Sequence, residues 1–233
     1  MNYAWLLFDL DDTLFNFQGA QHEAFFVTLE EMFLPVEEKT FEAYRRINGD
    51  LWDLLEKGRI TAKDLQTRRF SLLLDELGAE RDAEAMGRRY LANLGRRPEL
   101  IPGAAEVVPR LAEHVQLMMI TNGLKDVQRP RLAASPLKSY FPEMVISEEV
   151  GVAKPHAAIF EEAFRRMGHP AKDSVLIIGD SLSSDIRGGV DFGIDTCWFN
   201  PHGRPAQDDL QSRFEIRSLD QLFAVVGLDV AVA

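Results

Sequence analysis

The chain has 233 residues, which is enough for one large domain or for a domain that carries a smaller inserted one. Its 26 basic and 37 acidic residues give a net charge of −11, which argues against a nucleic-acid backbone as the main partner because there is no general positive excess to release counterions. A single cysteine (Cys197), the lack of a run of about 18 apolar residues and the lack of a basic leader argue against a secreted or membrane protein, so we expect a cytoplasmic one.

Short apolar runs alternate with helical patterns over much of the chain. Four runs have the length and composition of buried strands: residues 4–10, 115–120, 174–178 and 196–199. Helical patterns are found at residues 102–113, 157–167 and 185–192, and the tail predicts a short strand near 214–216 and a helix over 219–226. Strands that alternate with helices imply right-handed crossovers, so we predict an α/β fold with a doubly wound parallel sheet.

The segment between the first two strand candidates has a different pattern. It contains no strand-like run, and Phe41, Tyr44, Ile47 and Leu51 recur at helical spacing. Thr61 followed three residues later by an aspartate resembles a capping box at a helix start. We therefore predict an all-helical second domain over residues 17–97, inserted into an α/β core made of residues 1–16 and 98–233.

Two acidic residues, Asp9 and Asp11, follow the first apolar run in the stretch LLFDLDDTL. Side chains at positions i and i+2 of a strand point to the same side, so these carboxylates can converge at the carboxyl end of the strand. Ligands bind at that end of open α/β sheets, and two close carboxylates need a proton or a cation between them. The alternative is an acidic turn that caps the next helix, although the apolar run before it is unusual for a surface turn.

Three later stretches place further polar groups at the ends of strand candidates. Thr121-Asn122-Gly123 is the first of these stretches, although it is also a common turn sequence. Lys154 lies in the second, although a lone lysine is usually a solvated charge. Clustered aspartate oxygens without cysteine or paired histidine suit a hard cation, Mg²⁺ above all, while hydroxyl, ammonium and backbone N–H groups suit phosphate oxygens. This set indicates phosphoryl transfer, with one carboxylate as nucleophile and another as acid/base. Its candidate members are Asp9, Asp11, Thr121, Asn122, Gly123, Lys154, Asp180 and Asp185.

The order of these stretches is similar to the four motifs of the haloacid dehalogenase superfamily. The matching features are DxDxT at residues 9–13, Thr121, Lys154 before a proline, and GDSxxxD at residues 179–185. The helical insertion after the first motif resembles that superfamily's first class of cap domain. The resemblance implies a Rossmann-like core with an all-helical cap, and a phosphatase that forms an aspartyl-phosphate.

Roles for individual residues follow from the resemblance. It implies that Asp9 is the nucleophile and that Asp11 is the general acid/base, which also contacts the phosphate. It implies phosphate binding by Thr121, Asn122 and Gly123, and by Lys154, which steadies the nucleophile. The implied Mg²⁺ ligands are Asp9, Asp180 and the backbone carbonyl of Asp11, with Asp185 in a supporting role.

Two local stretches narrow the resemblance. Residues 193–201 (GIDTCWFNP) and 58–70 resemble a branch of 5′-nucleotidases that act on pyrimidine nucleoside monophosphates. The implied partner is a small phosphate ester. We expect no nucleic-acid or membrane partner, and we expect the protein to be a monomer or a homodimer. Candidate substrate contacts in the cap, each also explained by a structural or solvated role, are Phe17, His22, Lys57, Arg59 and Arg69.

Other functions remain open. Phosphoglycolate phosphatases, sugar-phosphate phosphatases and phosphomutases share the core motifs with similar caps. A haloacid dehalogenase is disfavoured by Asp11, because release of halide requires no proton donor. A non-catalytic binding protein is disfavoured because every expected catalytic position is occupied.

Overall fold

The chain forms two units in the computed structural model, which describes residues 2–206 and 209–228. One unit consists of Met1–Asn16, Glu99–Gly123 and Ala134–Ala233, and the other of Phe17–Pro98 with Leu124–Ala133. The second unit thus includes residues 124–133, which the predicted division left with the core. The predicted division also covers residue 1, residues 207–208 and residues 229–233, which lie outside the residues that the structure describes.

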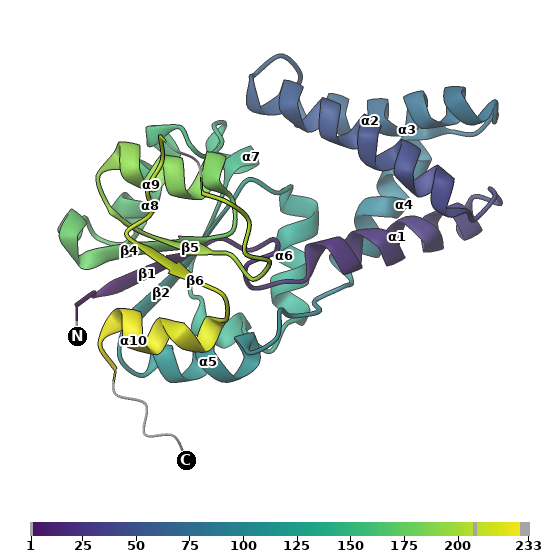
Figure 1. The fold of residues 1–233 in the computed structure, drawn as a ribbon. Helices are drawn as coiled ribbons and strands as arrows, with labels where there is room; N and C mark the ends of the chain where they lie inside the picture. Colours follow the sequence, from purple (N-terminus) through teal and green to yellow (C-terminus); the bar gives the residue numbers. More distant parts are fainter. Residues whose placement is uncertain (1, 207–208, 229–233) are drawn as a thin grey trace. The chain divides into compact units, whose positions relative to one another are not determined.

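The first unit contains a six-stranded, wholly parallel sheet in the order β3-β2-β1-β4-β5-β6 (Figure 1). This confirms the predicted α/β fold with a parallel sheet. The prediction missed β3, which is only three residues long. The strands are β1 (Trp5–Phe8), β2 (Gln116–Thr121), β3 (Met144–Ile146), β4 (Val175–Gly179), β5 (Asp195–Phe199) and β6 (Phe214–Ile216).

Helices cover both faces of this sheet, with α8 and α9 over one face and α5 and α10 over the other (Figure 1). In β1, Leu7 packs in one cluster with Phe160 of α8, while Leu6 and Phe8 alternate to the opposite side and are equally buried. Burial on both faces explains why the strands read as continuous apolar runs. The helices of this unit are α5 (Ala104–Ala112), α7 (Ser147–Val150), α8 (Ala157–Arg166), α9 (Arg187–Phe192) and α10 (Leu222–Val226).

The first strand ends at Phe8, two residues earlier than predicted. The Asp9 N–H still donates to the Ile178 carbonyl at 2.9 Å, and the chain then turns sharply. The N–H groups of the next residues, Thr13 to Phe15, all donate to the carbonyl of Leu10, and Asp12 has a φ of 58°. Asp9 and Asp11 therefore lie in a tight loop beyond the strand, where strand alternation does not determine their directions.

The second unit is entirely helical. The Thr61 hydroxyl accepts from the Asp64 N–H and the Asp64 carboxylate accepts from the Thr61 N–H, which confirms the capping box. Its core is aromatic: the Tyr44 ring lies 4.5 Å from Phe25 and 5.6 Å from Phe70, centroid to centroid. No helix in the described ranges is both long and apolar enough to cross a membrane. The helices are α1 (Phe17–Glu31), α2 (Glu38–Glu56), α3 (Ala62–Leu77), α4 (Ala83–Gly95) and α6 (Lys125–Ala134).

Helix α6 joins this unit through contacts with the end of α4. Gly95 lies close enough to α6 that an added Cβ would be 3.3 Å from the Asp126 carbonyl oxygen. Leu124 and Val127 belong to the same apolar cluster as the α1–α4 side chains. These contacts are non-local, so the sequence pattern alone could not assign α6 to the helical unit.

The approach of α3 to α4 depends on Gly87. A Cβ at this position would lie 2.6 Å from the backbone oxygen of Gln66, so we expect Gly87→Ala to destabilise the protein by about 1–3 kcal/mol. Gly49 in α2 has no described atom within 4 Å of such a Cβ, so Gly49→Ala should stabilise the helix by up to about 1 kcal/mol. Urea unfolding followed by circular dichroism measures both, and equal midpoints for the two variants would contradict the close packing.

Candidate active site

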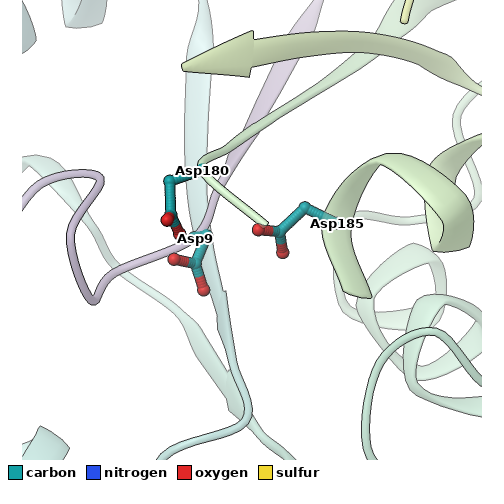
Figure 2. A group of neighbouring side chains, drawn as sticks. All are labelled: Asp9, Asp180 and Asp185. Atoms are coloured by element: carbon teal, nitrogen blue, oxygen red, sulfur yellow. The ribbon is translucent and has the colours of Figure 1, made fainter. Parts of the chain in front are cut away.

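Three aspartates meet beyond the carboxyl ends of β1 and β4, which are neighbours in the sheet. Asp9 follows β1, Asp180 follows β4, and Asp185 lies on the π-helical turn Leu182–Ile186 that leads into α9. One carboxylate oxygen from each lies within 4.8 Å of the others, and Figure 2 shows the three side chains turned toward one another. A concentration of negative charge in a largely buried place requires cations close by.

Lys154 supplies one such cation. Its side chain is only 1% exposed, and its Nζ donates to Asp9 Oδ1 at 2.6 Å, to Asp185 Oδ1 at 2.7 Å and to the Ile120 carbonyl at 3.0 Å. These three acceptors use all three ammonium protons. Burial lowers the pKa of Lys154, but the two carboxylates outweigh it and hold the pKa above its ordinary value. Lys154 is thus a buried, charged residue and not a solvated one.

Thr13 links the loop after β1 to the loop after β4. Its hydroxyl donates to Asp9 Oδ2 at 3.2 Å and accepts from the Asp180 N–H at 3.1 Å, so both oxygens of Asp9 have a donor. Burial raises the pKa of Asp9 above its ordinary range, although the Lys154 ammonium opposes the rise. The carboxylate form of Asp9 therefore depends on positive charge beside it.

Asn122 holds the backbone at Lys154. Its side-chain oxygen accepts from the Lys154 N–H at 2.8 Å, and its amide donates to the Lys154 carbonyl at 3.0 Å. Its own carbonyl accepts from the Ser147 hydroxyl, and beside it the Thr121 hydroxyl accepts from the Gly123 N–H at 3.0 Å. The loop after β2 is thus tied to the loop that carries the lysine, and the phosphate-binding roles expected for residues 121–123 remain predictions.

The Asp180 position is held by two residues to which the sequence assigned no role in the site. The Trp198 indole N–H donates to the Asp180 carbonyl at 3.0 Å, and Arg204 Nη2 donates to the same oxygen at 2.6 Å and to Asp180 Oδ2 at 3.3 Å. Burial, with the nearby Asp185 charge, raises the pKa of Asp180 to about 7, and Arg204 opposes the rise. In the sequence Trp198 is part of the apolar strand 196–199 and of the stretch 193–201, with no predicted contact to Asp180, and Arg204 lies in no recognised motif.

Asp11 lies apart from the three close carboxylates of the described chain. It is half-buried in the loop after β1, where its backbone forms a bridge with Phe15. Its predicted metal contact runs through the backbone carbonyl, and its predicted proton transfer runs through the side chain. Both roles stay predictions.

Close packing at the end of β4 gives a direct test of this arrangement. A Cβ on Gly179 would collide with the Asp185 side chain, so we expect Gly179→Ala to displace Asp185 and to lower the midpoint of thermal unfolding. Calorimetry should be run on this variant in the wild-type and Asp185→Ala backgrounds. The loss of stability should be smaller in the second background, because the carboxylate is gone and only the contact with the Cβ of residue 185, at 2.6 Å, remains; an equal loss in both backgrounds would refute the contact with the carboxylate.

The chain is similar to known proteins in both sequence and structure. Residues 6–199 match the model of a family described as haloacid dehalogenase-like hydrolases. The chain is 34% identical to the pyrimidine 5′-nucleotidase YjjG of Escherichia coli (95% of this chain, 97% of YjjG) and 35% identical to the pyrimidine 5′-nucleotidase PynA of Streptococcus pneumoniae (95% and 94%). A crystal structure of the HAD-hydrolase YfnB of Bacillus subtilis, bound to magnesium, superposes with a TM-score of 0.90 at 35% identity, covering 98% of this chain and all of that one.

Proposed function

Since the chain belongs to the haloacid dehalogenase-like hydrolases and is a phosphoric monoester hydrolase, we propose that it is a Mg²⁺-dependent 5′-nucleotidase. Its substrates are pyrimidine nucleoside monophosphates, which it hydrolyses to nucleoside and phosphate. The observation that carries the proposal is the pairing of Asp9 with Lys154 and Thr13 beside Asp180. The nucleotidase relatives, matched over nearly their whole length, support the substrate class.

The residues present fit a divalent cation. Asp9, Asp180 and Asp185 offer only hard oxygen ligands, which Mg²⁺ prefers. When ionised, these three carboxylates carry more negative charge than the Lys154 and Arg204 cations beside them offset, so the site keeps a negative charge that a cation can balance. In the proposed site Asp9, Asp180 and the Asp11 carbonyl would hold Mg²⁺, which would neutralise part of the charge of the incoming phosphate. Asp185 supports the site through Lys154.

The proposed reaction has two half-reactions at the Asp9 carboxylate. Asp9 attacks the phosphorus, the bond from phosphorus to the nucleoside oxygen breaks, and Asp11 gives that oxygen a proton. Asp11, now a base, takes a proton from a water that attacks the aspartyl-phosphate, which releases phosphate and restores Asp9. Lys154 holds Asp9 in place and offsets the repulsion between carboxylate and phosphate.

A panel of phosphate esters tests the proposal. We expect hydrolysis of UMP, dUMP and dTMP in preference to AMP, phosphoglycolate and glucose phosphates, with activity abolished by EDTA and restored by Mg²⁺. Phosphate release measures each rate. Activity confined to phosphoglycolate or sugar phosphates would overturn the nucleotidase assignment, and activity insensitive to EDTA would overturn the metal assignment.

A further inference from the structure

Arg69 of α3 lies at the centre of a buried polar group inside the helical unit. Its side chain is 3% exposed, and its Nη1 donates to Asn48 Oδ1 of α2 at 3.1 Å. Its guanidinium carbon lies 4.7 Å from the centre of the Tyr90 ring of α4 and 5.3 Å from that of Phe70. We call Arg69, Asn48, Tyr44 and Tyr90 the Arg69 cluster.

The cluster contains more hydrogen-bond donors than acceptors. Among the described residues, Arg69 Nε and Nη2 and the hydroxyls of Tyr44 and Tyr90 are buried without a hydrogen-bond partner. Burial raises the pKa of both tyrosines, so both hydroxyls keep their protons and remain potential donors. The Tyr44 hydroxyl has Arg69 and Tyr90 as polar neighbours and the Tyr90 hydroxyl has Tyr44 and Gln21, which together still offer fewer acceptors than the cluster has donors. A buried donor that lacks an acceptor destabilises the folded state, and a buried charge does so more strongly.

The missing counter-charge sets Arg69 apart from other arginines of the same unit. On the exposed surface, Arg46 pairs with Glu76 and Arg88 pairs with Glu84. Within the part of the chain that the structure describes, the buried Arg69 forms no such ion pair, although an unpaired charge is more destabilising in a buried position than in an exposed one. Stacking on Tyr90 and Phe70 offsets part of the cost, but an aromatic face accepts none of the in-plane N–H bonds.

We infer that the Arg69 cluster binds a planar ligand group that carries acceptor oxygens. The Nε and Nη2 atoms form one edge of the guanidinium, which presents two parallel N–H groups to such a ligand. The two tyrosine hydroxyls add donors from α2 and α4, and the aromatic rings of the cluster suit a flat partner. A pyrimidine ring with its carbonyl oxygens meets this description, and so does a free aromatic carboxylate. Binding of a pyrimidine ring rests on the proposed function, whereas binding of a free aromatic carboxylate does not.

The test compares Arg69→Met with Arg68→Met, an exposed neighbour on the same helix. Titration calorimetry measures binding of uridine and of benzoate, and steady-state rates give kcat/KM for UMP and for p-nitrophenyl phosphate, which lacks the pyrimidine. We expect Arg69→Met to weaken uridine binding by about tenfold or more and to lower the UMP to p-nitrophenyl phosphate ratio by a similar factor, relative to Arg68→Met. Tyr90→Phe, which keeps the ring and removes one hydroxyl, should act in the same direction if Arg69→Met does not fold.

Each outcome decides the inference. Loss of uridine binding in Arg69→Met identifies the ligand as the substrate's base, whereas loss of benzoate binding alone identifies a free carboxylic acid. If neither compound binds in a way that depends on Arg69 or Tyr90, the donors are satisfied by buried water and the inference is wrong. The proposed function is tested separately, by hydrolysis of UMP by the wild-type protein. If the wild type hydrolyses UMP and Arg69→Met leaves the ratio of kcat/KM for UMP to that for p-nitrophenyl phosphate unchanged, the inference about the Arg69 cluster is wrong and the proposed function stands.

Discussion

Replacing Asp9 with asparagine is expected to lower phosphatase activity by at least about a thousandfold, because the amide cannot attack phosphorus to form the covalent intermediate. Asparagine has nearly the same shape, and its one side-chain oxygen can still accept from Lys154 while its NH2 group faces the Thr13 hydroxyl oxygen, so the fold should persist. Phosphate release from UMP measures the loss, and circular dichroism verifies the fold.

Asp12→Asn is the matched control for this experiment. Asp12 lies in the same loop, but its carboxylate has no proposed role in the chemistry. We expect it to retain most of the activity. Trapping of labelled phosphate on the wild-type chain, and on the Asp12 variant but not the Asp9 variant, would identify the nucleophile directly. Full activity in Asp9→Asn would exclude the aspartyl-phosphate mechanism.

Replacing Lys154 with methionine is expected to remove activity and to destabilise the fold by about 3–5 kcal/mol, because the change leaves two buried carboxylates without their shared cation. Without the ammonium, Asp9 and Asp185 repel each other, and the pKa of Asp9 loses the contribution that lowers it. Urea unfolding in EDTA measures the stability, and phosphate release measures the activity.

The loss caused by Lys154→Met should depend on pH. Carboxyl groups whose pKa is raised in the folded state bind more protons folded than unfolded, so stability falls as pH rises above the unfolded value of about 4. The difference from wild type should therefore be larger at about pH 7 than at about pH 5. Adding Asp185→Asn to the variant should restore part of the lost stability. A variant as stable as wild type at neutral pH would show that the ion pairs contribute nothing.

Local sequence determined five of the six strands of the sheet and the capping box of α3. Strands buried on both faces must be apolar throughout, so β1, β2, β4 and β5 stand out as runs in the chain. The acidic residues that follow β1 and β4 stand out for the same reason, because charge directly after a buried strand is unusual. The order of these stretches was enough to indicate the family and the class of chemistry.

Only the tertiary structure decided which polar residues lie together. A buried Lys154 looks like any surface lysine in the sequence, and its partners Asp9 and Asp185 are 145 and 31 positions away. The Thr13 bond to the Asp180 N–H spans 167 positions, and the contacts of Arg204 with Asp180 carry no local pattern. Arg69 was one of several candidates in the helical segment until its burial set it apart. Each of these properties depends on desolvation and on contacts between distant segments, which exist only once the strands and helices have packed.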